Sequence, residues 1–269
     1  MRSILAITLL SFKEGLRQRV LYGMGLFALA TMFFAVMISG LFMRDIAKVT
    51  IDFSLAAVNL AGLLVPFFLA VNMLARDLER RTVFSILSQP LSRSDYIIGK
   101  FGGLLLLTST VVIILALGAF AAIYGSKLLY GPHYFTTLSW LALVQAVFLG
   151  LLGLIMLDAV VILWSCLTTS SFLVTLLTLA TFIVGHSLAD LVRFLASQAS
   201  GASALFLAKF LGIIQYVFPN LAAFDYKLAA AHGLVVPAAE TGLLVLYAGA
   251  YITAALCLAI FLFKRRDLL

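Results

Sequence analysis

Charged residues are scarce in this chain. Asp, Glu, Lys and Arg together account for 11% of the 269 residues, whereas a soluble domain carries about 25%. Hydrophobic residues account for 64%, so most side chains must face lipid or other buried helices. Because helices satisfy their own backbone hydrogen bonds inside a bilayer, the composition predicts an all-α polytopic membrane protein.

The sequence also lacks the motifs of several catalytic and metal sites. Its two cysteines, Cys166 and Cys257, lie in apolar segments without metal-ligand or disulfide spacing. Lys100 and Lys127 follow small residues but lack the rest of a phosphate-binding loop, and no HExxH motif occurs. The segment Gly201–Leu205 lacks the second glycine of a serine-nucleophile elbow. We therefore expect no catalytic residue, no metal site and no cofactor bound by this chain.

A net charge of +7 does not indicate nucleic-acid binding here, because the cations cluster beside apolar runs. In that position they orient the chain and meet lipid headgroups. Six apolar stretches can each cross the bilayer, which takes about 20 residues. The expected spans are residues 21–43, 53–75, 101–124, 137–164, 172–192 and 241–263. Gly99 and Gly103, at the start of the third span, form a GxxxG pair that favours close helix contact.

Two further segments are expected to be helical without crossing. In residues 1–19, Leu5, Leu9, Phe12 and Leu16 share one helix face, which predicts an amphipathic interfacial helix; a simple charged leader is the alternative. In residues 193–239, the apolar part is short for a crossing and Pro219–Asn220 interrupts it. We expect a pair of re-entrant helices there that enters the outer leaflet and returns.

The distribution of cations orients this topology. The proposed inner segments hold 12 Lys and Arg residues and the outer segments hold six. Cytoplasmic loops carry the excess of cations, so both termini and the loop of residues 76–100 are expected to be cytoplasmic. A multi-pass protein of the bacterial inner (cytoplasmic) membrane, in contact with the lipid bilayer, is the expected setting.

Residues 76–100 form the most informative polar segment. They read RDLERRTVFSILSQPLSRSDYIIGK and lie between two uncharged apolar runs. Their apolar residues recur at helical spacing, which predicts a short helix that packs against another surface. A structured docking surface on the cytoplasmic side is the interpretation; binding of lipid headgroups by a basic loop is the alternative.

Polar residues inside the spans are candidates for a substrate path or gate, because burying them in a membrane is costly. They are Asp158, His186, Asp190, Asn59 and Asn72. His186 and Asp190 are four residues apart and share one helix face near the outer end of the fifth span. A local hydrogen-bonded stripe is the structural alternative for this pair. For Asp158 the alternative is a structural hydrogen bond across the bundle or a dimer.

The polar segment resembles the cytoplasmic loop of ABC-2 type permeases, the membrane subunits of ABC exporters. The resemblance is carried by Glu79-x-x-Thr82, then Ile86–Arg93 (ILSQPLSR), then Gly99-Lys100-Phe101. Arg81 stands where that family usually has glycine. Phe12–Arg19 (FKEGLRQR) is similar to the connecting helix of the family.

The resemblance implies one transmembrane domain over residues 1–269 that transports substrate as a dimer, with a second copy of itself or a similar permease. A separate ABC ATPase subunit would bind ATP and Mg and dock on the cytoplasmic loop. The expected coupling residues are Glu79, Arg80, Arg81, Thr82, Phe84, Leu87, Pro90 and Arg93. An ion-driven secondary transporter, a membrane-embedded enzyme using His186 and Asp190, and an anchor protein are the other hypotheses.

Overall fold

The computed structural model describes residues 2–42, 45–71, 92–168, 170–198 and 218–265, and every regular element in these ranges is helical. The long helices are α1 (Arg2–Leu16), α2 (Val20–Ser39), α3 (Ile46–Leu64), α6 (Arg93–Tyr130), α7 (Trp140–Leu167), α8 (Ser171–Gln198) and α11 (Ala238–Arg265). The short elements are η1 (Val65–Ala70), η2 (Pro132–Phe135), η3 (Ala222–Phe224) and α10 (Lys227–Ala231). The expected all-α fold is confirmed.

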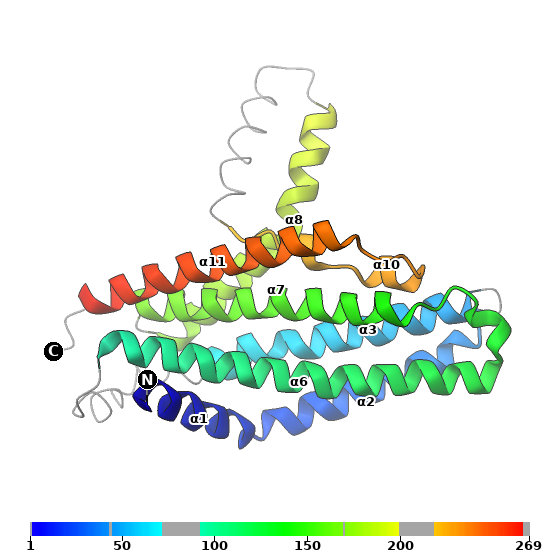
Figure 1. Ribbon diagram of the computed structural model, residues 1–269, viewed down its shortest axis with the longest axis horizontal. Helices are drawn as coiled ribbons and strands as arrows, with labels where there is room; N and C mark the ends of the chain where they lie inside the picture. The colour runs from blue at the N-terminus through cyan, green and yellow to red at the C-terminus, as the bar shows by residue number, and fades with distance from the viewer. Residues whose placement is uncertain (1, 43–44, 72–91, 169, 199–217, 266–269) are drawn as a thin grey trace.

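Helices α2, α3, α6 and α7 run in alternating directions, α8 projects obliquely away from the bundle, and α11 runs back along it. The start of α1 and the end of α11 therefore lie at the same end of the bundle (Figure 1). Within the described ranges, five helices are long and apolar enough to cross a membrane: α2, α3 with η1, α6, α7 and α11. In α8 the apolar segment is shorter, Ser171–Ser187. Five of the six expected spans therefore coincide with such a helix, and the protein is a multi-pass membrane protein.

Local sequence explains where several helices begin and end. Ser92 and Ser139 cap α6 and α7, because each hydroxyl accepts a hydrogen bond from the backbone amide three residues later, at 3.0 and 3.3 Å. Gly131 ends α6 with a φ of 101°, a conformation that glycine adopts without steric cost. Pro66 cannot donate a backbone hydrogen bond, and it opens the π-helical turn η1 that continues α3.

Helix α6 is much longer than the expected third span of residues 101–124. Its 38 residues would extend about 57 Å at 1.5 Å per residue, against a hydrocarbon core of about 30 Å. The extra turns at its start pack against α1. An added Cβ would lie 2.7 Å from Ile7 at Gly99 and 2.5 Å from Ser11 at Gly103. The predicted close contact at the GxxxG pair is confirmed, and its partner is the N-terminal helix of the same chain.

Helix α1 runs parallel to α6, because Ile7 lies at Gly99, Ser11 at Gly103 and Leu107 at Gly15, all with the same offset. The side of α1 that carries Ile7, Ser11 and Gly15 therefore faces the bundle. Leu5, Leu9 and Leu16, from the face predicted to be apolar, are exposed instead. This is the orientation that an interfacial helix needs to bury leucines in lipid, although its depth in the membrane stays a prediction.

Part of the expected outer re-entrant segment, residues 193–239, lies outside the described residues. From residue 218 onward the chain packs on the bundle: Ala230 and Ala231 of α10 join a buried cluster with Ile51 of α3. The side-chain amide of Gln145 in α7 also exchanges two hydrogen bonds with the backbone of Val236, at 3.1 and 3.0 Å. These contacts fasten the segment between α3 and α7.

We predict that Gly103→Val displaces α1 from α6. The added side chain would meet Ser11, and the backbone of α1 lies within 3.0–3.3 Å of the new Cβ, so the helix must move. Overpacking of this kind costs about 1–3 kcal/mol. A lower melting temperature in lipid nanodiscs and faster proteolysis after Lys13 would show it.

Gly125→Val on the same helix is the matched control, because no atom lies within 4 Å of its added Cβ. An equal loss of stability in the two variants would contradict the close contact between α1 and α6.

Candidate functional site

A cavity of about 510 Å³ lies between α3, α7, α8 and the segment around η3 and α10. Its volume falls in the range of small-ligand sites, about 300–1,000 Å³. The walls are mainly apolar and aromatic, with Phe53, Leu60, Leu157, Phe182 and Phe224 among them. Such a lining suits a ligand with a large apolar part.

Glycines on α7 create room on one side of this cavity. Gly150 and Gly153 both line it. An added Cβ would come within 2.6 Å of the Asn59 carboxamide oxygen at Gly150 and within 3.3 Å of Phe224 at Gly153. A larger residue at Gly150 would displace the Asn59 side chain, and one at Gly153 would press on Phe224. The shape of the cavity therefore depends on the small size of these two residues.

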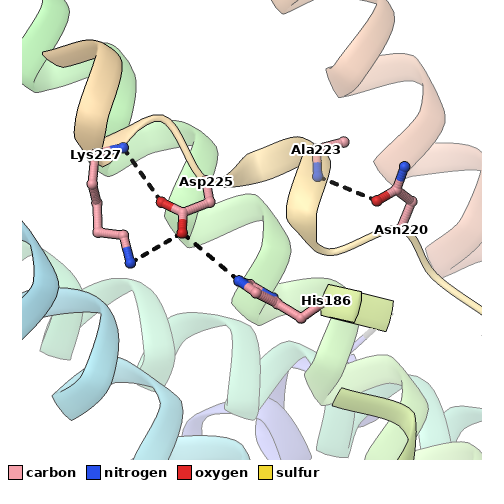
Figure 2. Close-up of polar contacts among 5 residues, drawn as sticks. All are labelled: His186, Asn220, Ala223, Asp225 and Lys227. Carbon is pink, nitrogen blue, oxygen red and sulfur yellow. Dashed lines mark hydrogen bonds and ion pairs between the residues drawn. The ribbon is translucent and has the colours of Figure 1, made fainter. Parts of the chain in front are cut away.

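One polar cluster lies on the cavity wall (Figure 2). The Asp225 carboxylate forms an ion pair with the Lys227 ammonium at 3.0 Å and lies 3.7 Å from His186 Nε2. The Lys227 backbone amide also donates to the other carboxylate oxygen at 3.4 Å. Burial raises the pKa of Asp225, but the polar contact with His186 and the hydrogen bonds and positive charge of Lys227 outweigh it and hold the pKa at about 2.

The cluster joins two separate parts of the fold. His186 belongs to α8, whereas Asp225 and Lys227 come from the turn between η3 and α10. Beside it the Leu221 amide donates to the Gly185 carbonyl at 3.0 Å, and any side chain at Gly185 would collide with the Pro219 carbonyl oxygen. Helix α8 and the segment after residue 218 are therefore held together by a polar side-chain contact, a backbone hydrogen bond and close packing.

One ring nitrogen of His186 could still form a hydrogen bond. Its Nδ1 atom is buried and has no hydrogen-bond partner among the described residues, while Nε2 faces Asp225. The ring packs against Phe182, with centroids 5.2 Å apart. A buried imidazole nitrogen without a partner is costly unless a ligand or water satisfies it.

The structure brings together two of the five residues predicted for the substrate path. Asn59 and His186 line the same cavity. Asp158 lies elsewhere in the bundle, where it is fully buried and accepts a hydrogen bond of 2.6 Å from the Thr108 hydroxyl of α6. That contact is the structural bond across the bundle considered for Asp158. Asn72 and the side chain of Asp190 lie outside the described residues.

Sequence reasoning missed Asp225 and treated Lys227 only as one of the outer cations. The available signal was the Asp225-Tyr226-Lys227 triplet, a pair of opposite charges in a segment that is otherwise poor in charge. His186 was paired in sequence with Asp190 because four residues separate them on one helix. Its partner in the structure is Asp225, which is 39 positions away and has no periodic relation to it.

The predicted coupling residues Glu79, Arg80, Arg81, Thr82, Phe84, Leu87 and Pro90 lie outside the described residues. Arg93, the last of that set, begins α6. Its guanidinium donates to the carbonyls of Phe263 and Lys264, at 3.4 and 3.1 Å, near the end of α11. A cation at this position also complements the negative end of the helix dipole.

Two further contacts join the first turns of α6 to its neighbours. The rings of Tyr96 and Phe263 stack at 6.1 Å, which reinforces the attachment to α11. The Lys100 ammonium lies 3.5 Å from the Glu14 carboxylate of α1, and its side chain is only 5% exposed. The residues that follow the predicted coupling loop are thus fastened to both terminal helices.

The fold and the cavity define a multi-pass α-helical membrane protein with a ligand-sized space between its helices, as expected of a membrane transport subunit. The description "ABC-2 family transporter protein" belongs to the family whose sequence model matches residues 5–268, and the chain belongs to this family. The resemblance found in residues 79–101 and 12–19 is thereby confirmed. Membership supports a role as a transport permease rather than an enzyme. No curated protein matches the chain.

We predict that Asp225→Asn destabilises the protein by about 1 kcal/mol, because Lys227 loses its counter-ion in a partly buried position. With a folded pKa of about 2, the carboxylate remains charged at pH 5–8. The stability that it contributes is complete above about pH 4, the usual value for aspartate, and is lost as the pH falls toward 2. Melting temperatures of wild type and variant across pH 3–8 measure this difference.

Asp45→Asn is the matched control, because its ion pair with Lys48, at 3.0 Å, is exposed on both sides and should contribute little. A gap between wild type and Asp225→Asn that closes well above pH 4 would contradict the low pKa of Asp225.

Proposed function

We propose that this chain is the permease subunit of an ATP-driven ABC exporter, with six crossings, both termini in the cytoplasm, and α8 as the sixth crossing helix. Two copies, or one copy and a similar permease, form the substrate path, and a separate ATPase subunit supplies the work in a bacterial inner membrane. The observation that carries this proposal is the family match over residues 5–268. The excess of cations at one end of the bundle supports the orientation.

The need for a partner ATPase follows from the sequence. Because the chain has no phosphate-binding loop of its own, nucleotide hydrolysis must occur elsewhere, and ATP and Mg would be held by that partner. The segment of residues 76–92 is the natural contact, because it joins the second and third crossings and resembles the loop that ABC-2 permeases use. Aromatic and arginine side chains commonly dominate protein–protein contacts, and Phe84 and Arg81 are residues of these two types.

The start of α6 provides a route by which movement of that loop would reach the rest of the subunit. Arg93 is bonded to the end of α11, and Lys100 is paired with Glu14 of α1. The glycines at 99 and 103 leave almost no space between α1 and α6, so the two helices must move together. A push on the loop would therefore tilt α6, α1 and the end of α11 as one body, as rigid-body alternating access requires.

The cavity is the proposed part of the substrate path within one copy. It is bounded by α3 and α7 on one side and by α8 and the η3–α10 segment on the other. A change of angle between these two walls would widen or close it. Large apolar side chains remain exposed on α2 and α11, such as Phe33 and Leu246, and lipid or a second copy of the permease would cover them.

An ion-driven transporter is the second candidate, and Asp158 is the observation that favours it. The carboxylate is fully buried and one of its oxygens, Oδ1, has no hydrogen-bond partner in the described part of the chain. Buried acids within spanning helices commonly belong to proton or ion pathways. Transport that persists with ATP after ionophores collapse all ion gradients would exclude this candidate.

We predict that Phe84→Asp and Arg81→Glu each reduce co-purification of the partner ATPase at least fivefold, because they place negative charge in the proposed contact. Membrane insertion should be unchanged, since the proposed topology assigns both residues to the loop between the second and third crossings. The measurement is the molar ratio of ATPase to permease after affinity purification from native membranes. Extraction of both variants at wild-type levels would establish that they insert normally.

Lys48→Glu and Lys127→Glu are matched charge reversals at the opposite end of the bundle, and they should retain the full ATPase complement. A full complement with both loop variants would contradict the coupling role of residues 76–92. So would labelling of a cysteine at position 84 from the outside of intact cells.

A further inference from the structure

The cavity combines features that point to a particular kind of ligand. It is elongated: its lining on α3 runs from Phe53 to Leu63, about 15 Å of helix at 1.5 Å per residue. Nearly all of this wall is apolar, and polar side chains are confined to Asn59, Thr31 and the Asp225 cluster. The Thr31 hydroxyl is already bonded to carbonyls of its own helix, at 2.9 and 3.1 Å.

The polar cluster of His186, Asp225 and Lys227 carries almost no net charge. Lys227 and Asp225 neutralise each other at 3.0 Å, and His186 adds a donor or an acceptor rather than a fixed charge. A ligand with an unbalanced charge would find no free counter-ion in the described lining. A headgroup that presents both signs, or donors and acceptors together, could contact the ammonium and the carboxylate at the same time.

We propose that this cavity binds a single-chain amphiphile with a zwitterionic headgroup. The acyl chain would lie along α3 and α7 among Leu60, Leu154 and Leu157, and the headgroup would lie at His186, Asp225 and Lys227. Burial of each methylene contributes about 0.8 kcal/mol in transfer from water, so the chain supplies affinity. The cluster supplies selection among headgroups. The site rests on the geometry of the cavity alone and does not require the ATPase.

The position of the acyl chain and the selection of the headgroup can be tested separately. A lysophosphatidylcholine with a diazirine near the end of its chain serves as the probe, with the full-length protein in nanodiscs at pH 8. After irradiation, mass spectrometry locates the adducts. We expect saturable labelling within residues 53–63 and 150–157 that an excess of unlabelled lysophosphatidylcholine competes away.

Filling the cavity tests the position of the chain. Leu60→Trp adds bulk at a lining position and should reduce this labelling at least fivefold. Leu243→Trp is the matched control, because Leu243 is an exposed leucine of α11 that does not line the cavity. Melting temperatures of both variants show that they remain folded. Equal labelling of α2 and α11 that excess ligand does not compete would show ordinary contact with bulk lipid and would overturn the proposal.

Changing the charge of the cluster tests the headgroup. A lysophosphatidylglycerol probe with the same chain carries a net negative charge and should label the wild-type cavity at least threefold less. Asp225→Asn leaves the Lys227 cation without its counter-ion, so it should reverse this preference in favour of the anionic probe. An unchanged preference in Asp225→Asn would overturn headgroup selection by the cluster, even if the chain still occupies the cavity.

Discussion

A charge taken out of water must be paired, and in a chain so poor in charge this constraint determines much of the structure. Among the described residues, the charged side chains that are buried are Lys100 and Asp158. Lys100 faces Glu14 of α1, and Asp158 accepts the hydroxyl hydrogen of Thr108 from α6. Each contact joins helices that are distant in sequence: an ion pair joins α6 to α1, and a hydrogen bond joins α6 to α7. The few polar residues thus select one arrangement among many apolar packings.

Close packing of small residues supplies the second constraint. Apolar surfaces alone give helices little preference inside a lipid bilayer, because lipid is as apolar as a leucine. Glycines favour particular helix contacts, because only a residue without a side chain allows so close an approach. Helix α1 approaches α6 at Gly99 and Gly103, η3 approaches α7 at Gly153, and the Pro219 carbonyl approaches α8 at Gly185. These positions place the N-terminal helix against the first turns of α6 and the segment after residue 218 against α7 and α8. The cavity is what remains between the contacts that they permit.

The sequence predicted the class and most of the helices, because their length and apolar character are local properties. Residues 101–124 were correctly assigned to a span, yet α6 extends from Arg93 to Tyr130, since capping by Ser92 and Gly131 sets its ends rather than hydrophobicity. The GxxxG contact was predicted, but its partner was not, because nothing in Gly99 or Gly103 specifies α1. The site was predicted only in part. Asn59 and His186 could be proposed as polar residues in spans, whereas Asp225 becomes part of the site only when the segment after residue 218 folds back against α8.

The cavity and the start of α6 lie in different parts of the same bundle, and their separation bears on how such a permease could work. Arg93, Tyr96 and Lys100 bind α6 to α11 and α1, so this end behaves as one unit. The cavity is bounded by α3 and α7 against α8, and α8 contacts the segment after residue 218 through His186 and Asp225. A rotation of the α6 unit would carry α7 with it through the bond between Thr108 and Asp158. Helix α8 is joined to α7 by the hydrogen bond from Trp164 to Thr181, at 3.1 Å, so any change in the angle between these two helices would change the shape of the cavity between them. Asp158 does not line the cavity, although its neighbour Leu157 does, and its bond to Thr108 would then serve as a mechanical link between α6 and the α7 wall of the cavity.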